Sequence, residues 1–151
     1  MPATPVADFE VAATGNQRFS SIAFRGHPYV LYFYPKDDTP GCTIEGSQFA
    51  ALHDQFIKAG YMVFGVSRDS VASHEKFKAK YNYPFDLLSD SEEVMCKAFD
   101  VIKEKNMYGK KVLGIVRSTF VMGPAGEIVK EWRGVKVEGH AQAVLDAIKS
   151  V

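Results

Sequence analysis

Residues 34–43 read Tyr34-Pro35-Lys36-Asp37-Asp38-Thr39-Pro40-Gly41-Cys42-Thr43, and they directly follow the apolar run Tyr29–Tyr34. The apolar run predicts a strand buried on both faces, and Pro35–Asp38 predicts a loop. Thr39 and Pro40 then predict a helix start, because threonine is favoured at the N-cap and proline at the first helical position. Cys42 is therefore expected in the first turn of a helix.

The position of Cys42 suggests a reactive thiol. In the first turn its sulfur lies among unpaired backbone N–H groups, at the positive end of the helix dipole. These groups stabilise an anion, so the thiol is expected to ionise readily and to act as a nucleophile. Glu45 adds a carboxylate nearby that could orient an arginine by a charge-assisted hydrogen bond. The alternative is that Cys42 is a small buried hydrophobe, as most free cysteines are.

Outward from this stretch, strand and helix patterns alternate along the chain. The predicted elements are a hairpin of Phe9–Ala13 and Gln17–Ser20, a helix from Thr39 to Gly60, a strand Tyr61–Ser67, a helix Val71–Tyr81, a strand Phe85–Leu88, a helix capped by Ser89-Asp90 and ending near Phe99, a loop Lys103–Lys111, a hairpin of Ser118–Met122 and Glu127–Trp132, and a helix His140–Lys149. This order predicts an α/β fold of the thioredoxin-like class, with a central mixed β-sheet flanked by helices and an N-terminal hairpin. One domain is expected over residues 1–151.

The composition excludes several classes of protein. Eighteen basic residues balance eighteen acidic ones, so no overall field is present to hold nucleic acid or a membrane surface. No secretory signal or membrane-spanning stretch is recognisable, and two cysteines suit a reducing compartment, so a cytoplasmic location is expected.

No metal site is predicted, because the histidines show no ligand spacing with one another or with the cysteines. Each histidine, His74 on its apolar helix stripe included, is expected to be a satisfied core or surface residue. The pair Asp37-Asp38 is interpreted as part of a solvated loop.

The pattern Pro35-x-x-x-Thr39-x-x-Cys42 resembles the active-site pattern of peroxiredoxins. The wider stretch Tyr34–Glu45 looks like the Q-type, or bacterioferritin comigratory protein, group of that family. Arg117, just before the predicted strand Ser118–Met122, matches the arginine of the family. The resemblance extends from Phe9 to the last predicted helix.

The resemblance implies a thiol-dependent peroxidase that reduces hydrogen peroxide and organic hydroperoxides and needs no cofactor. Cys42 would attack one peroxide oxygen and become a sulfenic acid. Thr39 would hydrogen-bond the substrate, while Arg117 would keep the thiolate ionised and stabilise charge on the oxygens. Backbone N–H groups at Gly41 and Cys42 would complete the set of donors, and Pro35 would shield the site.

The chain departs from the family in how Cys42 would be restored. Many Q-type members carry a second cysteine where this chain has Ser47, and another subgroup carries it in the helix corresponding to Val71–Tyr81, which has none here. The remaining candidate for a resolving cysteine is Cys96. Its apolar helix predicts a packed residue, and a Cys42–Cys96 disulfide would need Cα atoms within about 7 Å.

We therefore expect a one-cysteine mechanism in a monomer. An external thiol, namely thioredoxin, a glutaredoxin or glutathione, would reduce the sulfenic acid directly. Two alternatives stay open on the sequence: an atypical two-cysteine cycle through Cys96, and a peroxide-sensing or holdase module on the same fold.

Overall fold

The computed structural model describes residues 4–150, apart from the side chains of residues 105 and 107. Its centre is an eight-stranded mixed sheet with the strand order β1-β10-β9-β4-β5-β6-β2-β3. The strands of this sheet are β1 (Thr4–Pro5), β2 (Glu10–Ala13), β3 (Gln17–Ser20), β4 (Tyr29–Phe33), β5 (Met62–Ser67), β6 (Leu87–Ser89), β9 (Ser118–Met122) and β10 (Glu127–Arg133). β4 pairs in parallel with β5 and antiparallel with β9.

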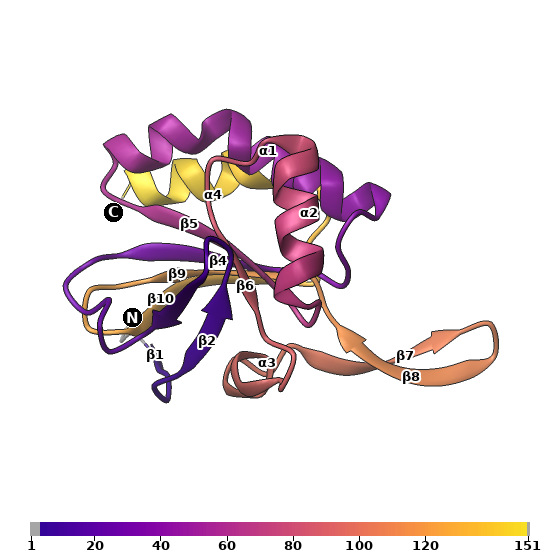
Figure 1. The fold of residues 1–151 in the computed structure, drawn as a ribbon. Coiled ribbons are helices and arrows are strands. Elements are labelled where there is room, and N and C mark those ends of the chain that lie inside the picture. Colours follow the sequence, from indigo (N-terminus) through magenta and orange to yellow (C-terminus); the bar gives the residue numbers. More distant parts are fainter. Residues whose placement is uncertain (1–3, 151) are drawn as a thin grey trace.

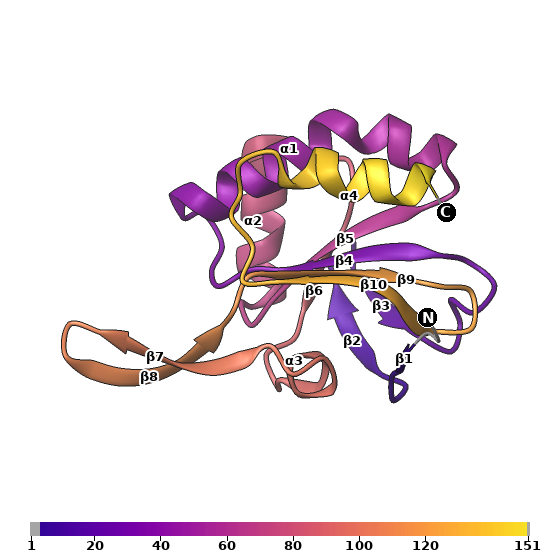
Figure 2. The ribbon, with the colours of Figure 1, turned by 180° about the vertical axis from the view of Figure 1, so that it is seen from behind.

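Helices cover both faces of the sheet, as predicted (Figures 1 and 2). α1 (Pro40–Lys58), α2 (Val71–Tyr81) and α4 (His140–Lys149) lie on one face, and the short α3 (Val94–Ala98) lies on the other. No helix among residues 4–150 is long and apolar enough to cross a membrane.

The central strand β4 divides the core in two. All its residues are buried, and their side chains alternate between the two faces because successive residues of a strand point in opposite directions. Val30 and Tyr32 join the core beneath α1 and α4, whereas Leu31 and Phe33 join the core beside α3. The continuous apolar run at residues 29–34 thus reflects burial on both faces, as the sequence predicts.

The prediction of a loop at Lys103–Lys111 is wrong. These residues belong to β7 (Ile102–Met107) and β8 (Lys110–Ile115), an antiparallel hairpin that projects from the body in orange (Figure 1). The two strands pair only with each other, so no buried face imposes the apolar alternation by which strands are recognised. The turn contains Tyr108 and Gly109, both with positive φ, and the glycine is the local sequence signal for such a turn.

Two other elements start elsewhere than predicted. The helix expected after Ser89-Asp90 begins only at Val94, because Ser89 is the last residue of β6 and Glu93, just before the helix, has a left-handed backbone. Asp90 still binds the helix start, since its carboxylate accepts hydrogen bonds from the backbone N–H groups of Met95 at 3.0 Å and Cys96 at 2.7 Å. The strand predicted at Phe85–Leu88 is shifted to Leu87–Ser89, because its pairing with β5 begins at Leu87 and ends at Ser89.

Candidate functional site

Cys42 is the third residue of α1 and only 2% exposed. Thr39 is the N-cap with extended backbone and Pro40 is the first helical residue, as the sequence predicts. The Thr39 hydroxyl, however, makes no capping bond and instead donates to the carbonyl of Lys36 at 2.9 Å. The first-turn N–H groups therefore gain no bond from the cap side chain, so they remain available as donors to an anion near the sulfur.

Arg117 reaches the sulfur from the other side of the site. Its Nη2 lies 3.4 Å from Sγ of Cys42, and its Nη1 donates to Oε1 of Glu45 at 2.7 Å. The sheet explains this meeting, because Phe33 at the end of β4 is paired with Ser118 at the start of β9. Arg117 therefore lies beside the loop that leads into α1. Arg117 thus places a positive charge within hydrogen-bonding distance of the sulfur.

Gly41 leaves the space that Arg117 occupies. A Cβ atom at position 41 would lie 3.1 Å from Nη2 of Arg117, which is closer than ordinary van der Waals contact. A side chain here would therefore require the guanidinium to shift by a few tenths of an ångström. The structure thus brings Gly41, Cys42, Glu45 and Arg117 together as the sequence predicts.

Glu45 is a fully buried carboxyl group. Its burial raises the pKa of Glu45 to about 7, although the charge and hydrogen bond of Arg117 act in the opposite direction. Among the described residues no group hydrogen-bonds its second oxygen, Oε2. Removal from water without a second donor explains why the charged form is disfavoured.

The raised pKa predicts a pH-dependent contribution to stability. Between pH 4.5 and about 7 the folded chain holds a proton on Glu45 that the unfolded chain has released. The free energy of unfolding from this group is therefore highest below pH 4.5 and falls as pH rises to 7, by about 1.4 kcal/mol per unit of pKa shift. Urea unfolding of the wild type and Glu45→Gln at pH 5 and pH 7.5 measures this fall in the free energy of unfolding. The variant is expected to lack it.

The wild type must be compared with Glu45→Gln because the titration of His140 changes stability with pH in the opposite direction. Burial, and secondarily the charge of Arg117, lowers the pKa of His140 to about 4. That group makes stability rise with pH over an overlapping range, but it is common to both proteins. An identical pH dependence of the wild type and Glu45→Gln would contradict the assignment.

The loop before α1 borders a shallow hollow. Pro35 follows β4 and is half-buried. A hollow of about 320 Å³ lies over the first turn of α1 and the end of α2, lined by Asp38, Thr39, Pro40, Thr43, Ile44 and Tyr81. Ile44 in this lining is 53% exposed. A small molecule can therefore rest beside the turn that holds Cys42.

Cys96 lies on the opposite face of the sheet. It is buried beside α3 in the core that includes Leu31 and Phe33, whereas Cys42 belongs to the core beneath α1 and α4. Burial, and then Asp90, raises the pKa of the Cys96 thiol well above its usual range, so the thiol is kept protonated. Both cysteines are free. The structure does not bring Cys96 to the site.

The interpretation of Asp37 as part of a solvated loop is wrong, whereas its neighbour Asp38 is exposed as expected. Asp37 is buried against α2, where it contacts His74. His74 is a satisfied core residue, as predicted. Asp37, Asp69 and His74 have side-chain atoms of the kind that bind metal ions, and these atoms lie within 4.8 Å of one another. Both ring nitrogens of His74, however, already have hydrogen-bond partners within the protein. No local sequence pattern reveals this cluster, because its members meet only through the pairing of β4 with β5.

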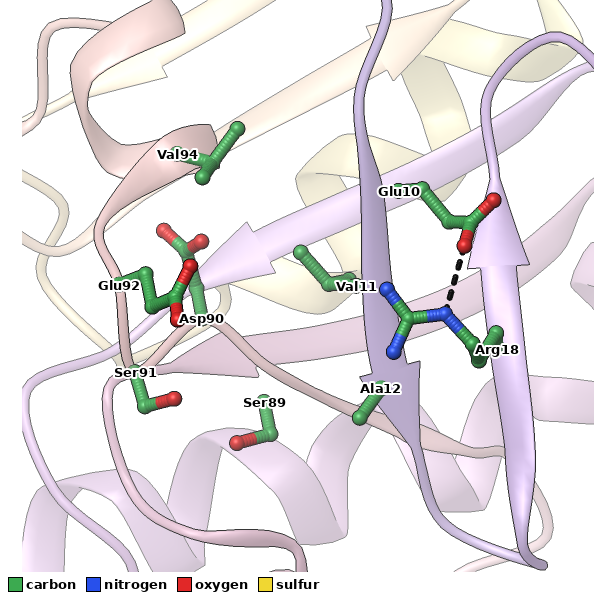
Figure 3. Close-up of a pocket in the computed structure, with 9 residues that line it drawn as sticks. All are labelled: Glu10, Val11, Ala12, Arg18, Ser89, Asp90, Ser91, Glu92 and Val94. Atoms are coloured by element: carbon green, nitrogen blue, oxygen red, sulfur yellow. Dashed lines mark hydrogen bonds and ion pairs between the residues drawn. The ribbon is translucent and has the colours of Figure 1, made fainter.

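A second hollow, of about 160 Å³, lies between the β2–β3 hairpin and the segment before α3 (Figure 3). Its main charged groups are already engaged. Arg18 is paired with Glu10 at 2.6 Å, and Asp90 binds the start of α3. This hollow therefore belongs to the support of α3 and not to the Cys42 site.

The chain is similar to known proteins over most of its length. The AhpC/TSA family matches residues 2–131. Peroxiredoxin Bcp of Xanthomonas campestris is 56% identical over 148 residues, which are 97% of this chain and 92% of that protein. Peroxiredoxin Bcp of Bacillus subtilis is 43% identical over 144 residues, 95% of this chain and 92% of that protein.

Solved structures give the same result. One structure of the Xanthomonas campestris bacterioferritin comigratory protein, described for its alkyl peroxide reduction activity, superposes with a TM-score of 0.90 at 56% identity, covering 94% of this chain and 90% of that chain. Peroxiredoxin Q of Xylella fastidiosa, solved as a mutant, superposes with a TM-score of 0.92 at 46% identity, covering 99% and 96% of the two chains.

Proposed function

Because this chain belongs to the AhpC/TSA family and is a peroxiredoxin, a thiol-dependent peroxidase, we propose that Cys42 is the residue that reacts with peroxide and that an external thiol restores it. The contact of Arg117 with the Cys42 sulfur carries this assignment. It places a permanent positive charge beside the Cys42 sulfur, in the first turn of α1, next to a hollow lined by residues of that turn.

The reaction follows from these charges. The Cys42 thiolate attacks the outer oxygen of the peroxide, an S–O bond forms and the O–O bond breaks. The electron pair goes to the departing oxygen, which takes a proton and leaves as water or an alcohol, and sulfur is left as sulfenic acid. Arg117 and the N–H groups at Gly41 and Cys42 stabilise the negative charge that moves across the oxygens.

Thr39 and Pro35 complete the proposed site. The Thr39 hydroxyl, which now donates to the Lys36 carbonyl, is positioned next to the helix start and would turn to a peroxide oxygen when substrate binds. Half-buried Pro35 limits the access of water. Glu45 acts through Arg117, whose guanidinium it holds toward the sulfur.

The hollow beside the first turn supports organic hydroperoxides as substrates in addition to hydrogen peroxide. Carbon-rich surface from Pro40, Ile44 and Tyr81 lies next to the polar Thr39 and Thr43. An alkyl group would gain from contact with this surface while its peroxide end reaches the sulfur.

Recycling by an external thiol is supported by the positions of the other candidate residues. Ser47 is exposed on α1 and has a hydroxyl where a second cysteine would be needed. Cys96 is separated from Cys42 by the sheet and has a protonated, buried thiol. A disulfide between them would require the core on one face to open.

The mass of the protein after one equivalent of hydrogen peroxide tests this route. We expect a gain equal to one oxygen atom, trapped by a sulfenic-acid reagent at Cys42, in both the wild type and Cys96→Ser. Loss of two hydrogen atoms from a monomer, abolished in Cys96→Ser, would instead establish the two-cysteine cycle.

A thiol reductant is implied by peroxidase turnover, and we propose thioredoxin, a glutaredoxin or glutathione for this role. Each is tested by the rate at which it supports peroxide consumption. A monomer and a cytoplasmic location remain predictions from the sequence, to be tested by sedimentation and by cell fractionation.

A further inference from the structure

Asp37 is a buried carboxylate in the loop that leads from β4 to the reactive turn. Its Oδ1 accepts a hydrogen bond from the Tyr34 hydroxyl at 2.6 Å. Its Oδ2 accepts one from Ser73 Oγ at 2.8 Å and lies 2.7 Å from Nδ1 of His74. Its backbone N–H donates to Asp69 at 2.9 Å. A loop residue with this many partners is held firmly to α2.

The partners of His74 define its protonation. Nε2 lies 2.9 Å from the carbonyl oxygen of Leu88, which can only accept, so Nε2 carries a hydrogen. The contact between Nδ1 and Asp37 then needs a second hydrogen, supplied either by the ring or by the carboxyl group.

The other neighbours of Asp37 indicate whether the ring or the carboxyl group supplies this hydrogen. Tyr34 and Ser73 each donate a hydrogen bond to Asp37, which favours the charged form of this carboxylate. The nearby carboxylate of Asp69 favours a positive charge on the His74 ring. These contacts favour an imidazolium ring in His74 over a neutral one, and the His74 side chain is fully buried.

Asp38 extends the attachment to the other end of α2. Its carboxylate accepts hydrogen bonds from Lys80 Nζ and from the Tyr81 hydroxyl, both at 2.7 Å. Lys80 and Asp38 are both exposed, so their ion pair contributes little by itself. The buried Asp37–His74 pair is the stronger of the two attachments, because a buried charge that loses its partner is costly.

We propose that His74 is a positioning residue for Cys42: as an imidazolium paired with Asp37, it holds the loop before α1 against α2. This proposal rests on the proposed function of Cys42. The loop ends at Thr39, the N-cap of α1, so its position determines where the Thr39 hydroxyl and the first-turn N–H groups lie relative to the sulfur. Small displacements of such groups lower reaction rates strongly.

Nitrogen NMR of the His74 ring in the full-length wild-type protein tests the charge. Two protonated ring nitrogens at neutral pH are expected. A neutral ring with a single N–H would overturn the assignment, and this measurement needs no variant to fold.

The rate constant for oxidation of Cys42 by hydrogen peroxide tests the positioning role. His74→Gln and Asp37→Asn are each expected to lower this rate constant about tenfold. The double variant is expected to lower it by no more than either single change, because each of the three variants removes the same Asp37–His74 pair. Phe56→Leu is the matched control, since Phe56 is a buried core residue near the end of α1 that lies far along the helix from Cys42. It is expected to lower stability and leave the rate constant unchanged.

The outcomes separate this inference from the proposed function. A wild-type protein whose Cys42 does not react with peroxide would overturn the proposed function. A reactive wild type with a folded His74→Gln or Asp37→Asn that reacts at the same rate would overturn the positioning role alone. Additive losses in the double variant would show that the two residues act separately and would also overturn it.

Discussion

Replacing Cys42 with serine is expected to abolish peroxide consumption in the presence of any thiol reductant. A serine hydroxyl stays protonated near neutral pH and cannot attack the peroxide oxygen, so both the first step and every later one are lost. The measurement is the steady-state rate of peroxide loss coupled to reductant oxidation. The variant should fold normally, because serine is close in size to cysteine and the hydroxyl can also accept from Arg117.

Cys96→Ser is the matched control for this experiment. Cys96 is buried on the other face of the sheet, and its replacement is expected to leave turnover intact while lowering stability by placing a hydroxyl in an apolar core. Turnover that persists in Cys42→Ser would refute the assignment of the nucleophile. Stoichiometric oxidation of the wild type without turnover would favour a peroxide sensor.

Replacing Arg117 with methionine is expected to lower the rate constant for Cys42 oxidation about a hundredfold or more, as when a preorganised donor is removed from a charged transition state. Two effects combine, because the guanidinium both favours the thiolate and stabilises the oxygens. The measurement is rapid-mixing kinetics with hydrogen peroxide. Arg117→Lys should restore only part of the rate, since an ammonium group lacks the planar fork that serves Cys42 and Glu45 together.

Arg68→Met provides the control for loss of an arginine. Arg68 pairs with Glu93 at 3.0 Å and donates to the carbonyl of Leu113, and neither partner belongs to the Cys42 site. Its removal is expected to change the rate constant little. Equal losses in Arg68→Met and Arg117→Met would show that a general effect of charge, and not the contact with the sulfur, is responsible.

Local patterns were sufficient wherever a segment is buried on a defined face. Helical spacing and capping residues predicted α1, α2 and α4 closely, with His140–Lys149 matched at both ends. The failures have different causes. The β7–β8 hairpin pairs only with itself, so it has no buried face to impose a pattern. α3 starts late because Ser89 belongs to β6 and Glu93, just before the helix, has a left-handed backbone. Of the two, only the position of β6 depends on pairing between distant segments.

The sequence alone determined that Cys42 begins a helix, because the signals for a helix start lie in adjacent residues. The family resemblance also named Arg117, and Glu45 was expected to orient an arginine from its place in the first turn. Only the tertiary structure decided that β9 lies beside β4, so that Arg117, 75 positions away, contacts the sulfur. It likewise placed Cys96 across the sheet and buried Asp37 against α2. Strand order is a property of the whole packed chain, and no local pattern encodes it.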